Sequence, residues 1–162
     1  MPSPYYTFTA GPAQFFALDT NRISEAQLIW LKEELARSKA KWKVAYGHHH
    51  VYSATRGGNA GLIGRLLPVL QAGGVDLYIC GHDHNLQHLK PEGGVHFFVA
   101  GGGGAGTYEL KDYERAIFKA QAHGFASLEV ETMRLKLRLI KADGTQAYEY
   151  SLEKQGRMAP GR

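Results

Sequence analysis

The sequence contains a single cysteine and only six prolines among 162 residues. One cysteine excludes an internal disulfide and a zinc site built from several thiolates of the chain. No apolar run approaches the roughly 18 residues that a membrane-spanning helix needs, so we expect no membrane partner. The opening residues, MPSPYY, contain neither the basic nor the apolar segment of a signal peptide, and we therefore expect a cytoplasmic chain.

The basic excess is small and is not clustered in the way that nucleic-acid binding requires. Nineteen Lys and Arg stand against fifteen Asp and Glu, a formal net charge of +4. The densest basic stretch, residues 134–141, alternates with Leu135, Leu137 and Leu139, which is typical of the polar face of a half-buried strand. We expect no nucleic-acid partner and, at most, a mild attraction for anionic substrates.

With 44% hydrophobic and 21% charged residues, the composition indicates a folded chain, and its pattern predicts an α/β fold. The first half alternates three predicted strands, at residues 15–18, 44–46 and 75–80, with two predicted helices, at residues 25–39 and 62–71. Ser24 and Gln27 form a capping box at the start of the first helix. Strands joined by crossover helices form parallel sheets, so we expect these three strands to lie parallel.

The second half predicts antiparallel strands instead. Five segments have strand character, at residues 86–89, 95–100, 125–130, 134–140 and 147–152. Asp143-Gly144 is a hairpin signal between the last two. No linker or repeat divides the chain, so we expect one domain over residues 1–162.

Histidine is the abundant reactive residue, with eight copies. His48, His49 and His50 follow the predicted strand at 44–46, while His82 and His84 follow the strand at 75–80. Ligands of open α/β sheets bind beyond the carboxyl ends of the strands, and residues two apart in an extended segment point the same way. The pattern therefore predicts that imidazoles from both strand ends converge.

Three imidazoles with an open coordination position are a donor set that zinc uses to activate water. We predict that His48, His82 and His84 hold one divalent ion, zinc in the first instance, with iron or manganese as alternatives. His49 or His50 is predicted to give a proton to the leaving group. The competing interpretation is that these are surface loop histidines without a ligand.

The other candidate motifs give weaker evidence of a catalytic or binding role. The glycine-rich residues 101–106 lack the Gly-Lys-Ser/Thr ending of a phosphate-binding loop, so we interpret them as a mobile connection. Ser53 has no nucleophile-elbow context and Cys80 falls within a predicted buried strand, so covalent catalysis has little support.

Several segments resemble the purple acid phosphatases, especially the small tartrate-resistant acid phosphatase type within the calcineurin-like metallophosphoesterases. The matching segments are FFALDTN at 15–21, Trp30-Leu31, YGHH at 46–49, Ser53, VDLY at 75–78 and GHDHNLQ at 81–87. The resemblance implies a calcineurin-like metallophosphoesterase fold, of which this chain matches the C-terminal half. The family's Gly-Asp-x-x-Tyr and Gly-Asn-His segments, the first with the bridging Asp, do not occur in residues 1–162.

The resemblance also implies a two-metal centre that hydrolyses phosphate esters. His48 and His82 would then share one ion and His84 would face the second, while Arg56 would hold a phosphate oxygen where mammalian-type enzymes place a histidine. We predict a hydrolase of phosphate mono-, di- or triesters with activated leaving groups, acting through a metal-bound hydroxide. The alternative is a non-catalytic metal-binding remnant. Because only one of the family's two related halves is present, we also expect a homodimer.

Overall fold

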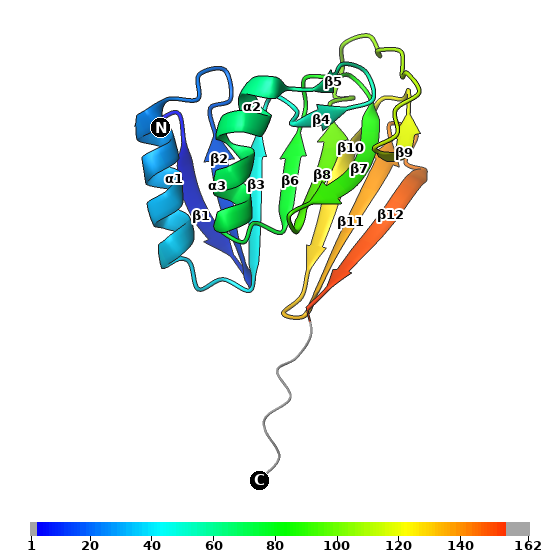
Figure 1. Ribbon diagram of the computed structural model, residues 1–162. Coiled ribbons are helices and arrows are strands. Elements are labelled where there is room, and N and C mark those ends of the chain that lie inside the picture. The colour runs from blue at the N-terminus through cyan, green and yellow to red at the C-terminus, as the bar shows by residue number, and fades with distance from the viewer. Residues whose placement is uncertain (1–2, 155–162) are drawn as a thin grey trace.

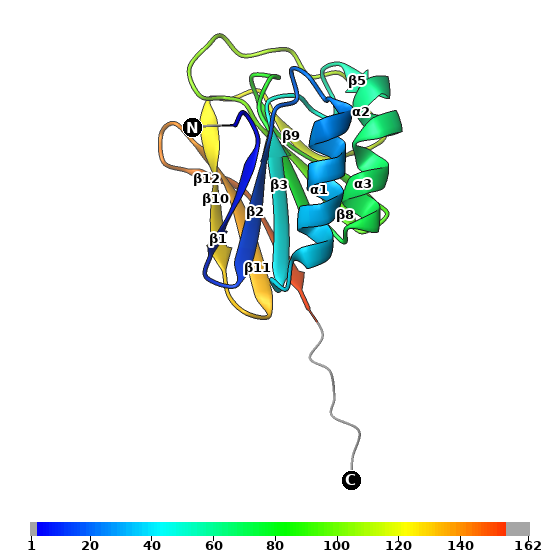
Figure 2. The same ribbon diagram turned by 90° about the vertical axis from the view of Figure 1, so that its left-hand side faces the viewer.

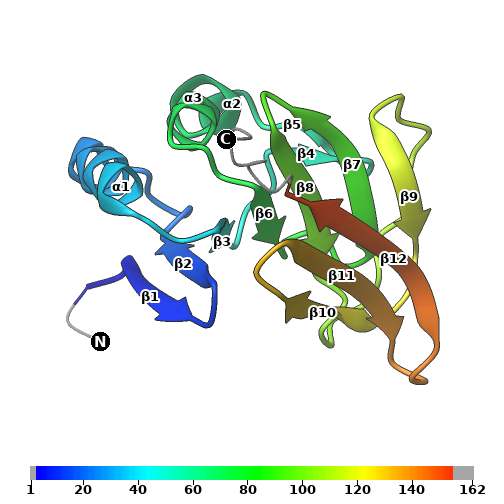
Figure 3. The ribbon, with the colours of Figure 1, turned by 90° about the horizontal axis from the view of Figure 1, so that it is seen from below.

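The computed structural model describes residues 3–154, so the ends of the predicted domain, residues 1–2 and 155–162, lie outside the described residues. Three layers pack on one another: helices, a seven-stranded sheet and a three-stranded sheet (Figures 1 and 2). The helices are α1 (Glu25–Arg37), α2 (Ala60–Arg65) and α3 (Leu67–Ala72). They cover one face of the large sheet, and the small sheet covers part of the other (Figure 3).

The large sheet has a parallel centre with antiparallel edges. The strands predicted at residues 15–18, 44–46 and 75–80 are parallel as expected, whereas the strand at residues 95–100, predicted among the antiparallel strands, pairs parallel with the strand at residues 77–80. Its strands in spatial order are β1 (Tyr6–Ala10), β2 (Ala13–Leu18), β3 (Trp42–Gly47), β6 (Leu77–Cys80), β8 (Val95–Ala100), β7 (Leu86–Glu92) and β9 (Ala116–Ala120). Strands β2, β3, β6 and β8 are parallel, whereas β1, β7 and β9 run against their neighbours. The small antiparallel sheet holds β10 (Gly124–Val130), β11 (Arg134–Lys141) and β12 (Gln146–Glu153). A two-stranded ribbon of β4 (Tyr52–Ser53) and β5 (Gly57–Gly58) completes the described strands.

The start of α1 differs in one detail from the predicted capping box. The Ser24 side chain accepts a hydrogen bond from the Gln27 amide at 3.2 Å, as expected. The Gln27 side chain does not return to Ser24, because it bonds both the N–H and the C=O of Asp19, at 2.8 and 3.0 Å. This exchange ties the start of α1 to the loop that follows β2.

The predicted helix at residues 62–71 is divided into α2 and α3. The division falls at Leu66, and Pro68 occupies the first turn of α3. Proline is tolerated in a first turn, where its missing N–H has no intrahelical partner to lose, but not in a helix interior. The single-helix prediction was therefore wrong at this proline.

Two apolar layers hold the sheets and helices together. On the helix side, Leu31 and Leu70 pack against Phe16 and Tyr78. Between the sheets, the leucines of β11 are buried and face Trp42 and Phe98, which confirms the predicted half-buried strand. A fully buried leucine contributes about 1.5–3 kcal/mol. Arg138 on the opposite face pairs with Glu129 and Glu149, each at 2.9 Å. Among the described residues, no helix is long and apolar enough to cross a bilayer.

His88 makes folding stability depend on pH. Its ring is fully buried between the sheets, stacked on Phe98 with ring centroids 4.0 Å apart, and its Nδ1 lies 3.0 Å from the Tyr148 hydroxyl. Burial lowers the pKa of His88 to about 4. The unfolded chain, with an ordinary histidine pKa near 6.5, therefore binds the proton first as the pH falls. The contribution of His88 to the free energy of unfolding is complete above about pH 6.5, and it is lost as the pH falls from 6.5 to 4.

We expect this histidine to account for about 2 kcal/mol of lost unfolding free energy between pH 7 and pH 5. Urea unfolding at both pH values measures it. The His88→Phe variant should lose less stability over this interval than the wild type, whereas a His123→Gln control, changed at an exposed site, should follow the wild type. Equal pH dependence in wild type and His88→Phe would contradict the assignment.

Candidate metal centre

Parallel pairing places the two histidine-bearing loops side by side. Strands β3 and β6 are neighbours, and Gly47 is opposite Cys80 at their carboxyl ends. Just beyond, the Gly81 N–H donates to the His48 carbonyl at 3.1 Å, which continues the pairing by one step. The predicted convergence of the two loops at one sheet edge is therefore present.

The backbone at these strand ends is tightly constrained. A Cβ on Gly47 would overlap Thr20 and crowd the hydroxyl of Tyr78, so only glycine fits there. That hydroxyl, on a fully buried tyrosine, donates to the His49 carbonyl at 2.7 Å. His82 has a φ of +57°, and it is the only non-glycine residue with positive φ in the described part of the chain. Such a conformation is costly for a residue with a side chain and is held by its surroundings.

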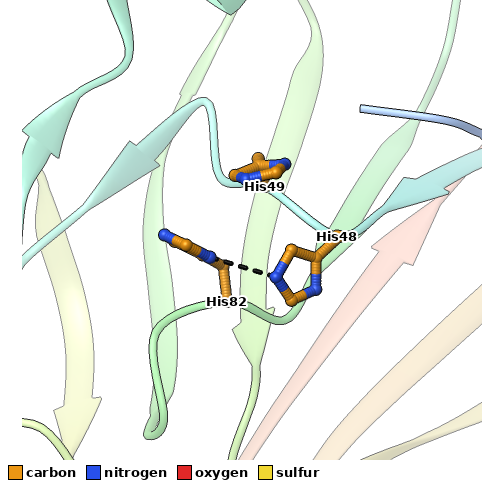
Figure 4. A group of neighbouring side chains, drawn as sticks. All are labelled: His48, His49 and His82. Carbon is orange, nitrogen blue, oxygen red and sulfur yellow. Dashed lines mark hydrogen bonds between the residues drawn. The ribbon is translucent and has the colours of Figure 1, made fainter. Parts of the chain in front are cut away.

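Three imidazoles meet at this edge: His48, His49 and His82 (Figure 4). Each offers a ring nitrogen, and the three nitrogens lie within 4.8 Å of one another. Nδ1 of His82 is 3.0 Å from Nε2 of His48. Two nitrogens bound to one tetrahedral zinc at about 2.0–2.1 Å lie about 3.3 Å apart, so this pair already has nearly the required separation. The residues fit a divalent ion.

The electrostatics of the group also suit metal binding. Burial lowers the pKa of His49, with a contribution from the neighbouring His48. Burial likewise lowers the pKa of His82, and the adjacent His49 lowers it further. Both rings are consequently held in the neutral form at neutral pH, which is the form that binds metals. Thr20 fixes the ring of His49, since its hydroxyl lies 3.2 Å from Nδ1 and accepts the His49 amide at 2.9 Å.

His84 is not part of this group of three. Its ring stacks on Tyr108 with centroids 4.2 Å apart, and its Nδ1 lies 2.9 Å from the carbonyl of Gly106. Because a carbonyl oxygen only accepts hydrogen bonds, Nδ1 of His84 carries the ring hydrogen and Nε2 keeps its lone pair. This tautomer is common for metal-bound histidines. The prediction that His48, His82 and His84 share one ion stays a prediction, as does the two-ion arrangement that the family resemblance implies.

Asp83, between the two histidines of its loop, is fully buried and organises the neighbouring loop. Its carboxylate accepts a hydrogen bond from Nε of Arg56 at 2.7 Å and another from the Ser53 hydroxyl. His50 faces the same carboxylate at 3.4 Å, too long for a good hydrogen bond, and is only 5% exposed. The Arg56 side chain is 49% exposed, with its guanidinium 5.3 Å from the centre of the Tyr108 ring.

The predicted catalytic residues differ in their exposure to solvent and in their hydrogen-bond partners. Arg56 reaches solvent beside His84 and Tyr108, whereas His50 is enclosed against Asp83. His49, which is partly exposed, is therefore better placed than His50 for proton transfer. Cys80 and Ser53 are buried, and burial raises the pKa of the Cys80 thiol.

Sequence reasoning missed Thr20, Asp83 and Tyr108 as parts of the site. Asp83 carried the clearest signal, since a residue between two predicted ligands points to the opposite side and must have a role of its own there. Nothing in the sequence pattern links Thr20 or Tyr108 to the histidines, because both contacts depend on tertiary packing.

Comparison with known proteins identifies relatives for this arrangement. The profile of the family described as calcineurin-like phosphoesterase matches residues 4–86. Tartrate-resistant acid phosphatase type 5 of Sus scrofa is 33% identical over 145 residues, which cover 83% of this chain and 43% of that protein. Purple acid phosphatase 4 of Arabidopsis thaliana is 35% identical over 132 residues, which cover 78% of this chain and 39% of that protein. The chain thus spans less than half the length of these relatives.

Solved structures confirm the fold. A purple acid phosphatase from yellow lupin, PPD1, superposes with a TM-score of 0.80 at 22% identity, covering 92% of this chain and 32% of that one. GAP50, described as the anchor in the inner membrane complex of Plasmodium, also gives 0.80, at 23% identity, covering 98% of this chain and 57% of that one. At this level of identity, the likeness concerns the fold alone.

We predict that His48→Ala and His82→Ala each lower zinc affinity at least tenfold, because each removes a nitrogen from the closest pair. Elemental analysis and competition with a chromogenic chelator measure content and affinity, on protein purified without a nickel column. His123→Ala, outside the group, should behave as the wild type. His84→Ala then separates one shared ion from two: loss of the same ion supports sharing, and loss of a second ion supports separate sites. Unchanged zinc content and affinity in His48→Ala would exclude it as a ligand.

Proposed function

This chain belongs to the calcineurin-like phosphoesterase family, and on that premise we propose that it hydrolyses phosphate esters in a metal-dependent reaction. The observation that carries the proposal is the group of His48, His49 and His82 at the carboxyl edge of the sheet, with the nearby Asp83 holding Arg56. Neutral imidazoles for a cation and a guanidinium for an anion occupy neighbouring loops. In the proposed reaction, the imidazoles bind the metal ion and the guanidinium binds the phosphate group of the ester.

His48 and His82 would hold a divalent ion, with zinc as the first choice and iron or manganese as alternatives, and His84 offers Nε2 to the same or a second ion. When bound, such an ion supplies a Lewis acid that polarises a phosphoryl oxygen and lowers the pKa of water. Imidazole ligands carry no charge, so they leave the full positive charge of the ion available to the substrate.

Arg56 is proposed to hold a phosphoryl oxygen. Its Nε donates to Asp83, which leaves the two terminal nitrogens as the further donors of the guanidinium. A guanidinium held at one edge presents the other as a fork, which fits two phosphate oxygens. The pKa of Arg56 is raised by Asp83, through the hydrogen bond and the charge, so this side chain stays protonated and does not act as a general acid.

His49 is proposed to donate a hydrogen bond from its neutral ring to the oxygen of the leaving group. It lies in the same group as His48 and His82, and contacts with Thr20 fix its ring. Activated leaving groups need the least help from an acid, so we propose mono-, di- or triesters with activated leaving groups as substrates.

The alternative is a metal-binding domain without useful turnover. The group of candidate ligands in the described residues contains no carboxylate, and Asp83 bonds Arg56 and Ser53 instead. A site that binds zinc but leaves phosphoesters intact would be this alternative.

We further propose that the chain is a homodimer. Strand β1 pairs only with β2 in the described chain, and the small sheet does not extend over it (Figure 3). Phe8, 43% exposed, and Phe15 stack there with ring centroids 5.0 Å apart. Exposed edges and aromatic patches favour a partner, and a second copy is the commonest one.

Light scattering tests the dimer. We expect twice the chain mass of 17.9 kDa, and a Phe8→Glu variant shifted toward the monomer because it places a charge on the patch. Ile29→Glu, at an exposed site on α1, is the matched control and should stay dimeric. A monomeric wild type at micromolar concentration contradicts the proposal.

A phosphoester panel tests the activity. With 4-nitrophenyl phosphate and bis(4-nitrophenyl) phosphate, we expect hydrolysis that a chelator removes, that added zinc restores, and that His82→Ala lacks. Arg56→Ala should raise KM at least tenfold with zinc content unchanged, since a charge-assisted phosphate contact is lost, and Arg56→Lys should recover only part of it. Chelator-insensitive background activity would instead support the non-catalytic alternative.

A further inference from the structure

A cavity of about 260 Å³ adjoins the histidine group and has no role in the contacts described so far. We call it the His49 cavity, since that ring forms the wall it shares with the metal-ligand candidates. Its lining comes from the loop after β2, from the end of β3 and from α2. The residues are Thr20, Asn21, Ile23, His49, Asn59, Gly61, Leu62 and Arg65.

The chemistry of the lining is polar and positive on one side and apolar on the other. Among the described residues of the lining, Arg65 is the one that carries a charge. The carboxylate of Asp19 is outside the lining and accepts hydrogen bonds from the amide and the side chain of Asn21. Arg65 is held at the rim by a hydrogen bond from its Nη1 to the Ile23 carbonyl at 2.8 Å. Ile23 and Leu62 supply apolar surface for a short carbon skeleton. The lining therefore suits a small molecule with an anionic end.

Glu25 is the group that competes for Arg65. Its carboxylate lies 3.7 Å away, but the two side chains are 69% and 50% exposed. Pairs this exposed contribute about 0–1 kcal/mol, so Glu25 leaves Arg65 available to a ligand. The side chain of Asn59 caps α2 through the Leu62 amide at 3.2 Å, which fixes the wall between them.

The volume of the cavity limits the size of the ligand that it can hold. Drug-sized ligands occupy pockets of about 300–1,000 Å³, so this cavity fits a group smaller than a nucleoside. We propose that the His49 cavity is a leaving-group subsite for a compact alcohol that carries a carboxylate. This proposal rests on the proposed function: with the phosphoryl group at the histidines and Arg56, the alcohol extends past His49 toward Arg65.

A matched pair of esters tests the subsite. 3-Phosphoglycerate and glycerol 3-phosphate have similar size and differ mainly in a carboxylate at the far end. The zinc-loaded wild type should have the higher kcat/KM for 3-phosphoglycerate. Arg65→Gln should lower the ratio of the two values about three- to fivefold, the effect of one partly exposed ion pair. Arg37→Gln, which removes an exposed arginine from the last turn of α1, should keep the wild-type ratio.

Binding of D-glycerate to the metal-free protein gives a readout independent of turnover. Amide shifts followed by NMR should move at residues of the His49 cavity, with a Kd that rises about three- to fivefold in Arg65→Gln. If both esters are hydrolysed and Arg65→Gln keeps the wild-type ratio, the subsite is wrong while the phosphatase proposal stands. If neither ester is hydrolysed but glycerate binds through Arg65, the cavity binds carboxylates but its role as a leaving-group subsite is overturned. The phosphatase proposal is decided separately, by the 4-nitrophenyl esters with their activated leaving groups. Absence of glycerate binding in the wild type overturns the subsite.

Discussion

The geometry of the site depends on the hydrogen bonds that the buried carboxylate of Asp83 accepts. A carboxylate with no solvent exposure is costly unless it is paired and hydrogen-bonded, and here Arg56 and Ser53 meet both needs. Around it, the side chain of Gln87 accepts from the Ala54 amide at 2.7 Å and donates to Ser53 at 3.1 Å. The ribbon of β4 and β5 is thereby fastened to the loop that follows β6 and to the start of β7. Loss of the Asp83 carboxylate would free the Arg56 guanidinium. It would also loosen the attachment of the β4–β5 ribbon to the loop that follows β6.

The glycine-rich residues 101–106 take their place from the same constraint. A Cβ on Gly101 would overlap the carbonyl oxygen of Asp83, and one on Gly102 would crowd the backbone at Ala122 and Gly124. Gly101 therefore allows close packing against the Asp83 loop, and Gly102 allows close packing against the backbone of residues 122–124. The chain then returns over the site, where the Tyr108 amide donates to the His84 carbonyl at 3.1 Å. Tyr108 thus contacts two of the predicted site residues, since its ring stacks on His84 and lies 5.3 Å from the Arg56 guanidinium.

Sequence patterns predicted the topology better than the side-chain directions. Strands β3 and β6 and the convergence of His48 with His82 followed from apolar runs and the parallel-sheet rule. Strands β1 and β9 were missed, because their alternation is short and their burial partial. The inference that His82 and His84 point the same way assumed an extended backbone. The positive φ of His82 breaks that assumption, and the two rings have different partners.

The distribution of charge around the histidines decides what such a site can attract. In related chemistry, carboxylate ligands offset the charge of a bound cation, but here the group of candidate ligands in the described residues has no carboxylate, and Asp83 is paired with Arg56. Any cation held by neutral imidazoles would keep its whole charge, with Arg56 beside it and Arg65 at the rim of the adjoining cavity. Water screens exposed pairs strongly, but a cation fixed in a partly buried site is screened far less. The affinity of this edge of the sheet for anions therefore rises when the metal binds, so metal and phosphate ester should bind in a mutually reinforcing way.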